Sequence, residues 1–311
     1  MAQLGKHGLL FLLERTTGKP IFGVKERPVP KSDVPGEESW PTQPFPVKPP
    51  PLVRLTITPS ELNRTTPETT KACEELFNTL RHEGPFTPYS SAKPSLVLPS
   101  TAGGANWYDM AYDPKLGYLI ANITNSSAVG HMIPRTEGQT IRVGGNTKLA
   151  MPYTNEGGYT PSQAGFRDPT TGRPCFQPPW GELVAVNANT GDIAWRVPLG
   201  TDEEMEANGI MNTGTNSVGG SLVTGGLIFI GATADRLFRA FDTRDGRILW
   251  SSKMDGVVRA SPMTYKTKKG KQYIVVSMGI QAGRGRGQSP QTQSAPDSSS
   301  HATVIAFALP E

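Results

Sequence analysis

A segment that occurs twice, each time as an apolar strand, a turn and a tryptophan, constrains the fold of this chain more than any other feature. The first copy, LVAVNANTGDIAW, covers residues 183–195, and the second, LFRAFDTRDGRILW, covers residues 237–250. In each copy a turn glycine precedes the tryptophan by four residues, in the pairs Gly191 with Trp195 and Gly246 with Trp250. The two tryptophans are 55 residues apart (250 − 195). Repetition at such a period indicates a propeller or a solenoid.

The strands and turns of these copies favour a propeller blade. Apolar runs rich in Val, Ile and Phe, divided by Thr-Gly or Asp-Gly turns, predict strands in tight hairpins. A large ring at a fixed distance from a turn glycine is suited to dock between neighbouring sheets. The alternative is a β-sandwich with two unrelated tryptophans. A third, weaker copy near the N-terminus, in which Phe22 follows Gly18 by four residues, favours the propeller.

The composition is that of a turn-rich globular protein. The chain has 311 residues and is 36% hydrophobic, so it can bury a large core in one domain or two. Its 34 Gly and 29 Pro argue against a helical protein. The net charge of +4 is mild, so we expect no nucleic-acid partner, and we interpret the AGRGRGQ stretch as a flexible loop between strands. The apolar run Leu9–Leu13 is too short to span a membrane, and no signal peptide is expected.

Two polar, proline-containing excursions are expected to interrupt the β pattern. Residues 27–52 contain nine prolines. Such a density is expected to forbid a regular ladder and to favour an ordered, polyproline-like segment laid over a surface, with a disordered linker as the alternative. Residues 130–180 form a second excursion rich in Gly and Pro.

One short helical insertion is predicted over about residues 58–84. Thr66 suits the N-cap, Pro67 suits the first helical position, and Gly84 supplies a stop. An apolar stripe at helical spacing is expected to dock this insertion onto the β body rather than to bind a cofactor. The stripe consists of Ala72, Cys73, Leu76, Phe77 and Leu80.

The remaining chain reads as β-strands up to a last strand at residues 303–309. Met1 leads almost directly into a strand, and the strands suffice for about four blades. We therefore expect the second half of a propeller, with an exposed strand edge and a tendency to dimerise or aggregate if it is produced alone.

Several segments, taken in order, carry a specific family resemblance: GKHGLLFLLERTTGKPIF, ERPVPKSDVPGE, PTQPFP, LFNTLRHEGPFTP, PCFQPPWGELVAVNANTGDIAW, GATADRLFRAFDTRDGRILW and ASPMTYKTKKGKQYIVV. Together they resemble the C-terminal half of the dehydrogenases that depend on pyrroloquinoline quinone (PQQ), above all their quinoprotein glucose dehydrogenase branch. The resemblance covers residues 1–311. It implies an all-β fold that is part of an eight-bladed propeller with PQQ near its axis.

The resemblance also implies a mechanism and three site residues. In the family a calcium ion and a basic side chain polarise the C5 carbonyl of PQQ, a carboxylate removes the substrate hydroxyl proton, and hydride passes to the quinone. Lys6 matches the cofactor-contacting lysine and takes the catalytic role of stabilising the reduced quinone oxygen. Asn122 matches an asparagine whose amide donates to the cofactor, and Asp235 matches a polar position that faces the same pocket. The alternatives are a solvated surface lysine, a turn asparagine and a hydrogen bond within a blade turn.

Other expected parts of such a site are not assigned to this chain. The family's calcium ligands and proton-accepting aspartate lie upstream of the lysine that Lys6 matches, so no metal ligand is named here. No Cys-x-x-Cys-His segment occurs, so no covalent haem is expected, and electrons are expected to leave to ubiquinone or a periplasmic cytochrome. Cys73 and Cys175 permit a disulfide in an oxidising compartment or remain as buried thiols. His7 is interpreted as a turn residue rather than a base, and His131 as a residue without an evident partner.

The sequence therefore predicts PQQ-dependent oxidation of a sugar or alcohol, most directly an aldose such as glucose, at a periplasmic or periplasm-facing location. The expected macromolecular partner is the N-terminal half of the propeller or a second copy. The alternative function is a non-catalytic PQQ-like propeller that serves as a protein-binding scaffold. The excursions at 27–51 and 130–180 favour the enzyme, because a bare scaffold does not need long insertions that cover a cofactor.

Overall fold

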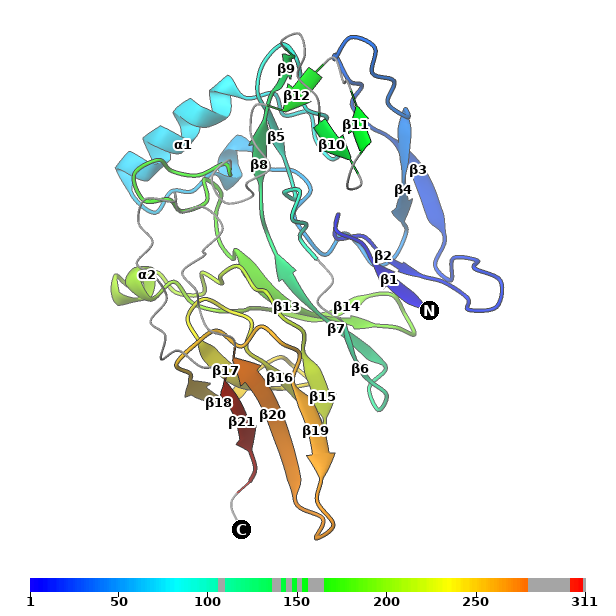
Figure 1. Ribbon diagram of the computed structural model, residues 1–311, viewed down its shortest axis with the longest axis vertical. Coiled ribbons are helices and arrows are strands. Elements are labelled where there is room, and N and C mark those ends of the chain that lie inside the picture. The colour runs from blue at the N-terminus through cyan, green and yellow to red at the C-terminus, as the bar shows by residue number, and fades with distance from the viewer. Residues whose placement is uncertain are drawn as a thin grey trace.

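The computed structural model describes residues 1–105, 110–135, 141–143, 147–149, 153–155, 165–278 and 303–309. The AGRGRGQ stretch lies outside these ranges, so its interpretation as a loop stays a prediction. The described residues form antiparallel sheets, with helix α1 (Pro67–Thr79) at the upper end and the C-terminal sheet at the lower end of the view in Figure 1. No helix among them is long and apolar enough to cross a membrane.

Two four-stranded sheets have the form of propeller blades. The first has the order β14-β13-β7-β6 and the second the order β15-β16-β17-β18. The strands of the first are β6 (Ala111–Asp113), β7 (Tyr118–Thr124), β13 (Gly181–Asn187) and β14 (Ile193–Pro198). The strands of the second are β15 (Leu222–Thr224), β16 (Leu227–Ile230), β17 (Leu237–Asp242) and β18 (Ile248–Lys253). Because β7 pairs with β13, the excursion between them is an insertion within one sheet.

The C-terminal sheet has three strands in the order β19-β20-β21. It consists of β19 (Met263–Lys266), β20 (Gln272–Met278) and β21 (Thr303–Phe307). The predicted last strand is therefore present. Strand β21 pairs only with β20 among the described residues, and Val304 is 70% exposed on it. The exposed strand edge that the sequence predicts stays a prediction.

The aromatic residues of the first and the N-terminal copies dock on the glycine turn of the next sheet, whereas Trp250 of the second copy contacts Phe307 of β21 at 5.3 Å between ring centroids. Trp195 donates from Nε1 to the carbonyl of Thr243 at 2.9 Å, and its ring lies so close to Gly246 that a Cβ there would be 2.7 Å from it. Phe22 covers Gly191 in the same way, at 2.9 Å from the position of a Cβ. The predicted docking role of these rings, including the weaker N-terminal copy, is confirmed.

The N-terminal part of the chain forms two small sheets. Strands β1 (Ala2–Leu4) and β2 (Leu10–Leu12) pair with each other, and Leu9, Leu10 and Leu12 are buried in a core that also contains Val184 and Val186 of β13. Apolar burial at about 25 cal/mol per Å² is the main force that holds these sheets together.

The proline-rich excursion contains a regular ladder, so the prediction that its prolines forbid one is wrong. Strand β3 (Val24–Pro28) pairs with β4 (Thr42–Pro46) over five residues. The Val47 N–H donates to the Gly23 carbonyl at 3.1 Å, so the pair of residues 23 and 47 is hydrogen-bonded. In an antiparallel ladder hydrogen-bonded and non-hydrogen-bonded pairs alternate. The pairs formed by even-numbered residues are therefore those without mutual hydrogen bonds. All prolines of the ladder lie in these pairs, where no N–H is required; they are Pro28, Pro44 and Pro46.

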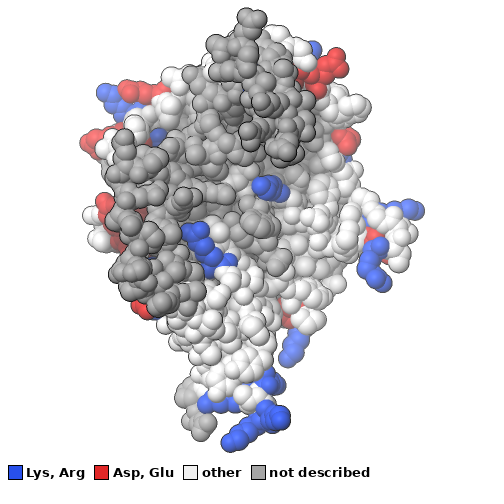
Figure 2. Space-filling model, viewed as in Figure 1, with Lys and Arg blue, Asp and Glu red and all other residues white. Residues whose placement is uncertain are grey.

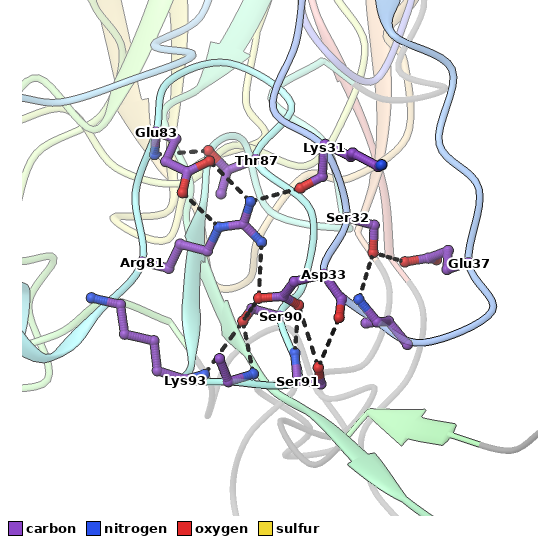
Figure 3. A network of polar contacts seen from close by, with 12 residues as sticks. Lys31, Ser32, Asp33, Glu37, Arg81, Glu83, Thr87, Ser90, Ser91 and Lys93 are labelled. Carbon is purple, nitrogen blue, oxygen red and sulfur yellow. Dashed lines mark hydrogen bonds and ion pairs between the residues drawn. The ribbon is translucent and has the colours of Figure 1, made fainter.

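A polar network ties the β3–β4 connection to the chain after helix α1 (Figure 3). The Asp33 carboxylate accepts the Ser90 hydroxyl at 2.5 Å and the Ser91 N–H at 2.9 Å. Arg81 donates from Nη2 to the Lys31 carbonyl at 2.7 Å, and its Nη1 lies 3.5 Å from the Asp33 carboxylate. The connection is therefore held by charge-assisted bonds at several points.

Helix α1 (Pro67–Thr79) begins as predicted and ends earlier. The Thr66 hydroxyl accepts the Thr69 N–H at 3.1 Å, which is an N-cap bond. The helix ends before Leu80 rather than near Gly84, because Arg81 exchanges backbone hydrogen bonds with the chain at Pro94 and Leu96. Tertiary pairing thus ends the helix before the glycine is reached.

The apolar stripe of α1 packs on the insertion between β7 and β13. Its Cys73 is fully buried and forms a disulfide with Cys175, with a Cα–Cα distance of 5.2 Å. Leu76, Phe77 and Leu80 contact the same core. This decides the open question about the two cysteines in favour of the disulfide.

Short elements complete the structure. They are η1 (Pro59–Glu61), β5 (Ser95–Val97), β8 (Ala128–Gly130), β9 (Met132–Pro134), β10 (Ile141–Val143), β11 (Thr147–Leu149), β12 (Tyr153–Asn155) and α2 (Glu203–Ala207). His131 lies between β8 and β9, and its Nε2 is 3.3 Å from the Ser91 carbonyl. The expectation that His131 lacks a partner is therefore wrong, because the fold brings residue 91 to it.

Charged side chains are spread over the surface in small groups (Figure 2). On the face shown, the lower tip is basic. The β19–β20 turn, which lies at this end in Figure 1, contains Lys268 and Lys269. Acidic and basic groups lie close to one another at the upper left and upper right of this view.

Candidate cofactor site

Lys6 lies in the tight turn between β1 and β2. The turn is closed by hydrogen bonds from the Gly5 N–H to the Leu9 carbonyl (3.1 Å) and from the Gly8 N–H to the Gly5 carbonyl (2.8 Å). Gly8 has φ of +72°, a conformation that glycine adopts without strain. The turn therefore holds Lys6 at the end of the sheet with an exposed side chain.

A cavity of about 250 Å³ opens beside Lys6. Its walls combine the lysine with apolar side chains and two hydroxyls: Lys6, His7, Leu55, Phe86, Val97, Leu98, Pro99, Ser100 and Thr101. Within the described part of the chain no carboxylate forms an ion pair with the Lys6 ammonium. A cation without a counter-ion at the mouth of a largely apolar cavity is suited to bind a planar anion.

His7 closes one side of this cavity and is fixed by the turn. Its Nδ1 accepts the Leu9 N–H at 3.0 Å, and its ring makes edge contacts with Phe11 and Phe86 at 6.3 and 6.2 Å between centroids. Burial lowers the pKa of His7 below its ordinary value. Because Nδ1 accepts a hydrogen bond, the neutral ring carries its proton on Nε2.

Asn122 lies near the end of β7 and is buried. Its amide nitrogen donates to the Ser217 hydroxyl at 3.2 Å and to the Gly219 carbonyl at 2.9 Å. Both amide hydrogens are therefore used within the protein. Donation to a cofactor from this position requires that one of these two bonds is exchanged.

Asp235 lies in the turn between β16 and β17, with no exposed side-chain surface. Its carboxylate accepts the Thr233 hydroxyl at 2.6 Å and the Thr201 N–H at 2.9 Å, and it pairs with the guanidinium of Arg239. Burial raises the pKa of Asp235, but the hydrogen bonds from Arg239 and Thr233 and the Arg239 charge lower it more, so the group is held ionised. All of these bonds join Asp235 to its own and the neighbouring sheet.

A series of contacts connects the ends of successive sheets. The Gly104 N–H donates to the Lys6 carbonyl at 2.8 Å, and the Gly104 carbonyl accepts the Thr124 N–H at 2.7 Å. The Thr124 hydroxyl accepts the Ser217 N–H at 3.1 Å, and Ser217 forms a β-bridge with Thr233.

The three residues named from the sequence lie along this series. Lys6 is the first residue of the series and Asn122 donates to Ser217. The Asp235 carboxylate accepts the hydroxyl of Thr233, the last residue of the series. The structure thus places them at corresponding ends of neighbouring sheets. Their side chains do not share one cavity, since only Lys6 of the three lines the cavity described above.

Sequence reasoning missed Arg239, the buried partner of Asp235. Its side chain is 4% exposed and also donates to the Thr233 hydroxyl at 3.1 Å. The sequence contained one signal for this pair, the even spacing of Asp235 and Arg239, because side chains at even spacing in a strand point to the same face. The sequence alone does not show that this alternation extends from β17 back to Asp235 in the preceding turn.

The described residues contain no group of three or more His, Cys, Asp or Glu side chains that is arranged to hold a metal ion. The calcium ligands, which the resemblance places upstream of Lys6, are not assigned to residues of this chain. The anionic quinone cofactor is different, because the unpaired Lys6 ammonium fits its negative charge.

The four-stranded antiparallel sheets define the class of the protein as a β-propeller, and comparison with known proteins identifies the family. Residues 1–274 match the family model of the PQQ glucose/ethanol/alcohol dehydrogenase β-propeller domain. The chain belongs to this family.

Individual relatives carry several substrate names. The chain is 34% identical over 287 residues to the quinate/shikimate dehydrogenase (quinone) of Acinetobacter baylyi, which covers 88% of this chain and 35% of the relative. It is 35% identical over 295 residues to the glycerol dehydrogenase large subunit of Gluconobacter thailandicus, covering 88% of this chain and 39% of that protein. It is 31% identical over 294 residues to the quinoprotein glucose dehydrogenase of Escherichia coli, with 88% and 35% covered. The chain thus spans little more than a third of the length of these relatives.

A solved structure shows the same fold at lower identity. The quinohemoprotein alcohol dehydrogenase from Comamonas testosteroni superimposes with a TM-score of 0.53 at 19% identity, over 99% of this chain and 35% of that one. The predicted propeller is therefore confirmed. The number of eight blades and the glucose branch stay predictions, because the relatives named for quinate, glycerol and glucose have similar identities.

Proposed function

We propose that this chain forms part of a PQQ-dependent dehydrogenase that oxidises a hydroxyl group of a sugar or another alcohol. The observation that carries the proposal is the Lys6 ammonium, which has no ion-pair partner in the described structure and lines the cavity at the end of the β1–β2 turn. When bound, PQQ supplies the quinone that accepts hydride from the substrate.

The residues of this chain would bind and orient the reacting groups. The Lys6 ammonium would hold the negative charge that develops on a quinone oxygen. Leu55, Phe86 and Leu98 would exclude water from that charge and so strengthen its interaction with the lysine. Asn122 and Asp235 would hold the neighbouring sheet ends in register. Direct contact of these two side chains with the cofactor is a further part of the proposal. The proton-accepting carboxylate and the calcium ligands are expected from outside this chain, and no step is assigned to them here.

An aldose such as glucose is the proposed substrate within the wider class. The relatives named for glucose, glycerol and quinate support a compound with several hydroxyls. Ubiquinone or a cytochrome is the proposed electron acceptor. A periplasmic or periplasm-facing location is proposed because the Cys73–Cys175 disulfide requires an oxidising compartment to persist.

The proposed macromolecular partner is a further set of blades, supplied by an N-terminal half or a second copy. Gly191 and Gly246 are each covered by an aromatic ring of the preceding sheet, whereas no atom of the described residues lies within 4 Å of a Cβ position on the equivalent Gly18. The Gly18 turn is thus an unfilled place for such a ring. A blade that ends in the same glycine-to-aromatic pattern has the matching chemistry.

The alternative of a non-catalytic scaffold is favoured by one observation. The amide of Asn122 and the carboxylate of Asp235 are both engaged by protein groups. A propeller that only binds proteins would use these residues in the same way, and would not depend on Lys6.

Titration of the purified chain with PQQ in the presence of calcium distinguishes the two functions. We expect binding in the micromolar range, lost in Lys6→Ala and retained in Lys115→Ala, which removes an exposed lysine from another turn. Dye reduction with a panel of aldoses and polyols then tests turnover. Binding without turnover supports a half-site that needs its partner, whereas no binding by the folded chain would favour the scaffold.

A further inference from the structure

A second cavity, of about 270 Å³, lies between the hairpin at residues 166–175 and the segment at 199–216. It shares no lining residue with the cavity beside Lys6. Its walls are Arg167, Thr171, Gly172, Arg173, Pro174, Trp180, Asp202, Thr215 and Asn216. The hairpin is held by hydrogen bonds from the Cys175 N–H to the Phe166 carbonyl and from the Asp168 N–H to the Arg173 carbonyl, both 2.9 Å.

Arg167 is a partly buried cation without a counter-ion. Its guanidinium donates one hydrogen bond, from Nη1 to the Gly172 carbonyl at 2.6 Å. No carboxylate of the described residues lies within ion-pair distance of it. Burial lowers the pKa of Arg167, and no neighbouring charge offsets this effect. The group stays protonated at any ordinary pH, so its positive charge is left to be satisfied by a ligand or by water.

The second arginine of the cavity is satisfied within the protein. Arg173 donates from Nε and Nη2 to Asp202 at 2.9 and 3.1 Å, and from Nη2 to Glu204 at 2.8 Å. Asp202 also accepts the Met205 N–H at 3.1 Å as the N-cap of α2. The one carboxylate in the cavity wall, Asp202, is therefore paired with Arg173, and Arg167 is the charged group of the wall that has no partner among the described residues.

The other walls suit a small organic ligand. Trp180 is 4% exposed and its Nε1 donates to the Phe176 carbonyl at 2.9 Å, so the ring contributes apolar surface. The Asn216 amide is exposed and makes no hydrogen bond with another described side chain. A guanidinium fork, an amide and an aromatic wall form a common combination for recognising a carboxylate or phosphate on a small molecule.

We propose that this cavity binds a small organic anion, whose carboxylate or phosphate group is held by the guanidinium of Arg167 and whose remainder lies against Trp180. The cavity adjoins the sheet ends of the candidate cofactor site, because Thr201, next to Asp202, donates to Asp235 at 2.9 Å. The binding itself is independent of PQQ, so it can be measured when the dehydrogenase proposal fails.

Calorimetric titration of the chain without PQQ tests this inference with two matched ligands, D-gluconate and D-sorbitol. Both are open-chain polyols of the same configuration, and only gluconate carries a carboxylate. We expect gluconate to bind, sorbitol to bind at least tenfold more weakly, and the gluconate affinity to fall as salt is raised. Arg167→Gln should lower the gluconate affinity about tenfold or more, since a charge-assisted bidentate contact is lost. Arg15→Gln removes the same charge from an exposed position and should leave the affinity unchanged.

Titration with inorganic phosphate distinguishes the two sources of the anion. Tighter binding of phosphate than of gluconate would assign a phosphorylated ligand, and the reverse order a carboxylate; both results support the site. If Arg167→Gln does not fold, Arg167→Lys and Asn216→Ala replace it, and each should weaken binding several-fold. Equal gluconate affinity in the wild-type chain and a folded Arg167 variant would overturn the inference, as would the absence of binding by both anions.

Discussion

Replacement of Asp235 by asparagine separates its structural role from its expected cofactor role. The substitution keeps the shape of the side chain but removes the charge that compensates Arg239, whose side chain is 4% exposed. Breaking one partner of a buried ion pair costs about 3–5 kcal/mol, because the remaining charge stays buried and unpaired. The asparagine amide can also not accept from Thr201, Thr233 and Arg239 at the same time. We expect the free energy of unfolding to fall by about 3–5 kcal/mol.

Urea unfolding followed by tryptophan fluorescence measures this loss, and it should appear as a midpoint lower by about 1 M or more. Asp255→Asn serves as the control, because Asp255 is an exposed aspartate in the next connection and its replacement should change stability by less than about 0.5 kcal/mol. The double variant Asp235→Leu/Arg239→Met should recover part of the loss, because no charge is then left buried. A midpoint for Asp235→Asn within error of the wild type, together with weaker PQQ binding, would refute the structural role.

The pH dependence of the same variant follows from the sign of the pKa shift. The pKa of Asp235 is lowered from its ordinary 3.8 in the folded chain. As the pH falls, Asp235 is therefore protonated in the unfolded chain at a higher pH than in the folded chain. Its contribution to stability is therefore present above about pH 4 and is lost as the pH falls through the lower folded pKa. The difference in stability between the wild type and Asp235→Asn should shrink below pH 4.

Three further predictions concern the packing of the sheets and excursions. Trp195→Ala removes the ring that covers the next sheet and its hydrogen bond, and should destabilise the chain by about 3–5 kcal/mol, measured by calorimetry; a loss below 1 kcal/mol would show that the docking is incidental. The Cys73→Ser/Cys175→Ser variant opens a bridge between residues separated by 102 positions and should lose about 2–5 kcal/mol of stability, with no further effect of reductant on the variant. Asp33→Asn weakens the bonds to Ser90 and Arg81 and should speed limited proteolysis in the β3–β4 connection, while unchanged cleavage would contradict the role given to this network.

The repeat pattern predicted the blades and their docking because these depend on short-range features. A strand, a turn glycine and an aromatic residue at a fixed offset place the ring on the same side of every blade, and the structure seats Trp195 and Phe22 on the glycines of the next sheet. The start of α1 was predictable for the same reason, since an N-cap bond joins residues three positions apart.

Features that depend on distant partners were predicted less well. The prediction that the prolines forbid a ladder was wrong, because the density of prolines does not show which paired positions they occupy. Pro44 and Pro46 avoid the hydrogen-bonded positions only through their pairing with β3. Helix α1 ends before Gly84 because Arg81 pairs with the strand region near Leu96. The cavity around Arg167 combines a hairpin of the insertion between β7 and β13 with residues about forty positions later in the chain, so no local sequence pattern predicts it.

By itself the sequence determined the type of sheet, the docking of Trp195 and Phe22, and the position of Lys6 in its turn, since each depends on a short stretch of consecutive residues, and it determined the family resemblance through several such stretches in order. The tertiary structure alone decided that Cys73 meets Cys175, that Asp235 is engaged by Arg239 and Thr201, and that Arg167 is left without a counter-ion. The physical reason is that the free energy of a buried charge or thiol depends on the groups around it in space. Those groups come from strands and insertions whose contacts only the folded chain defines.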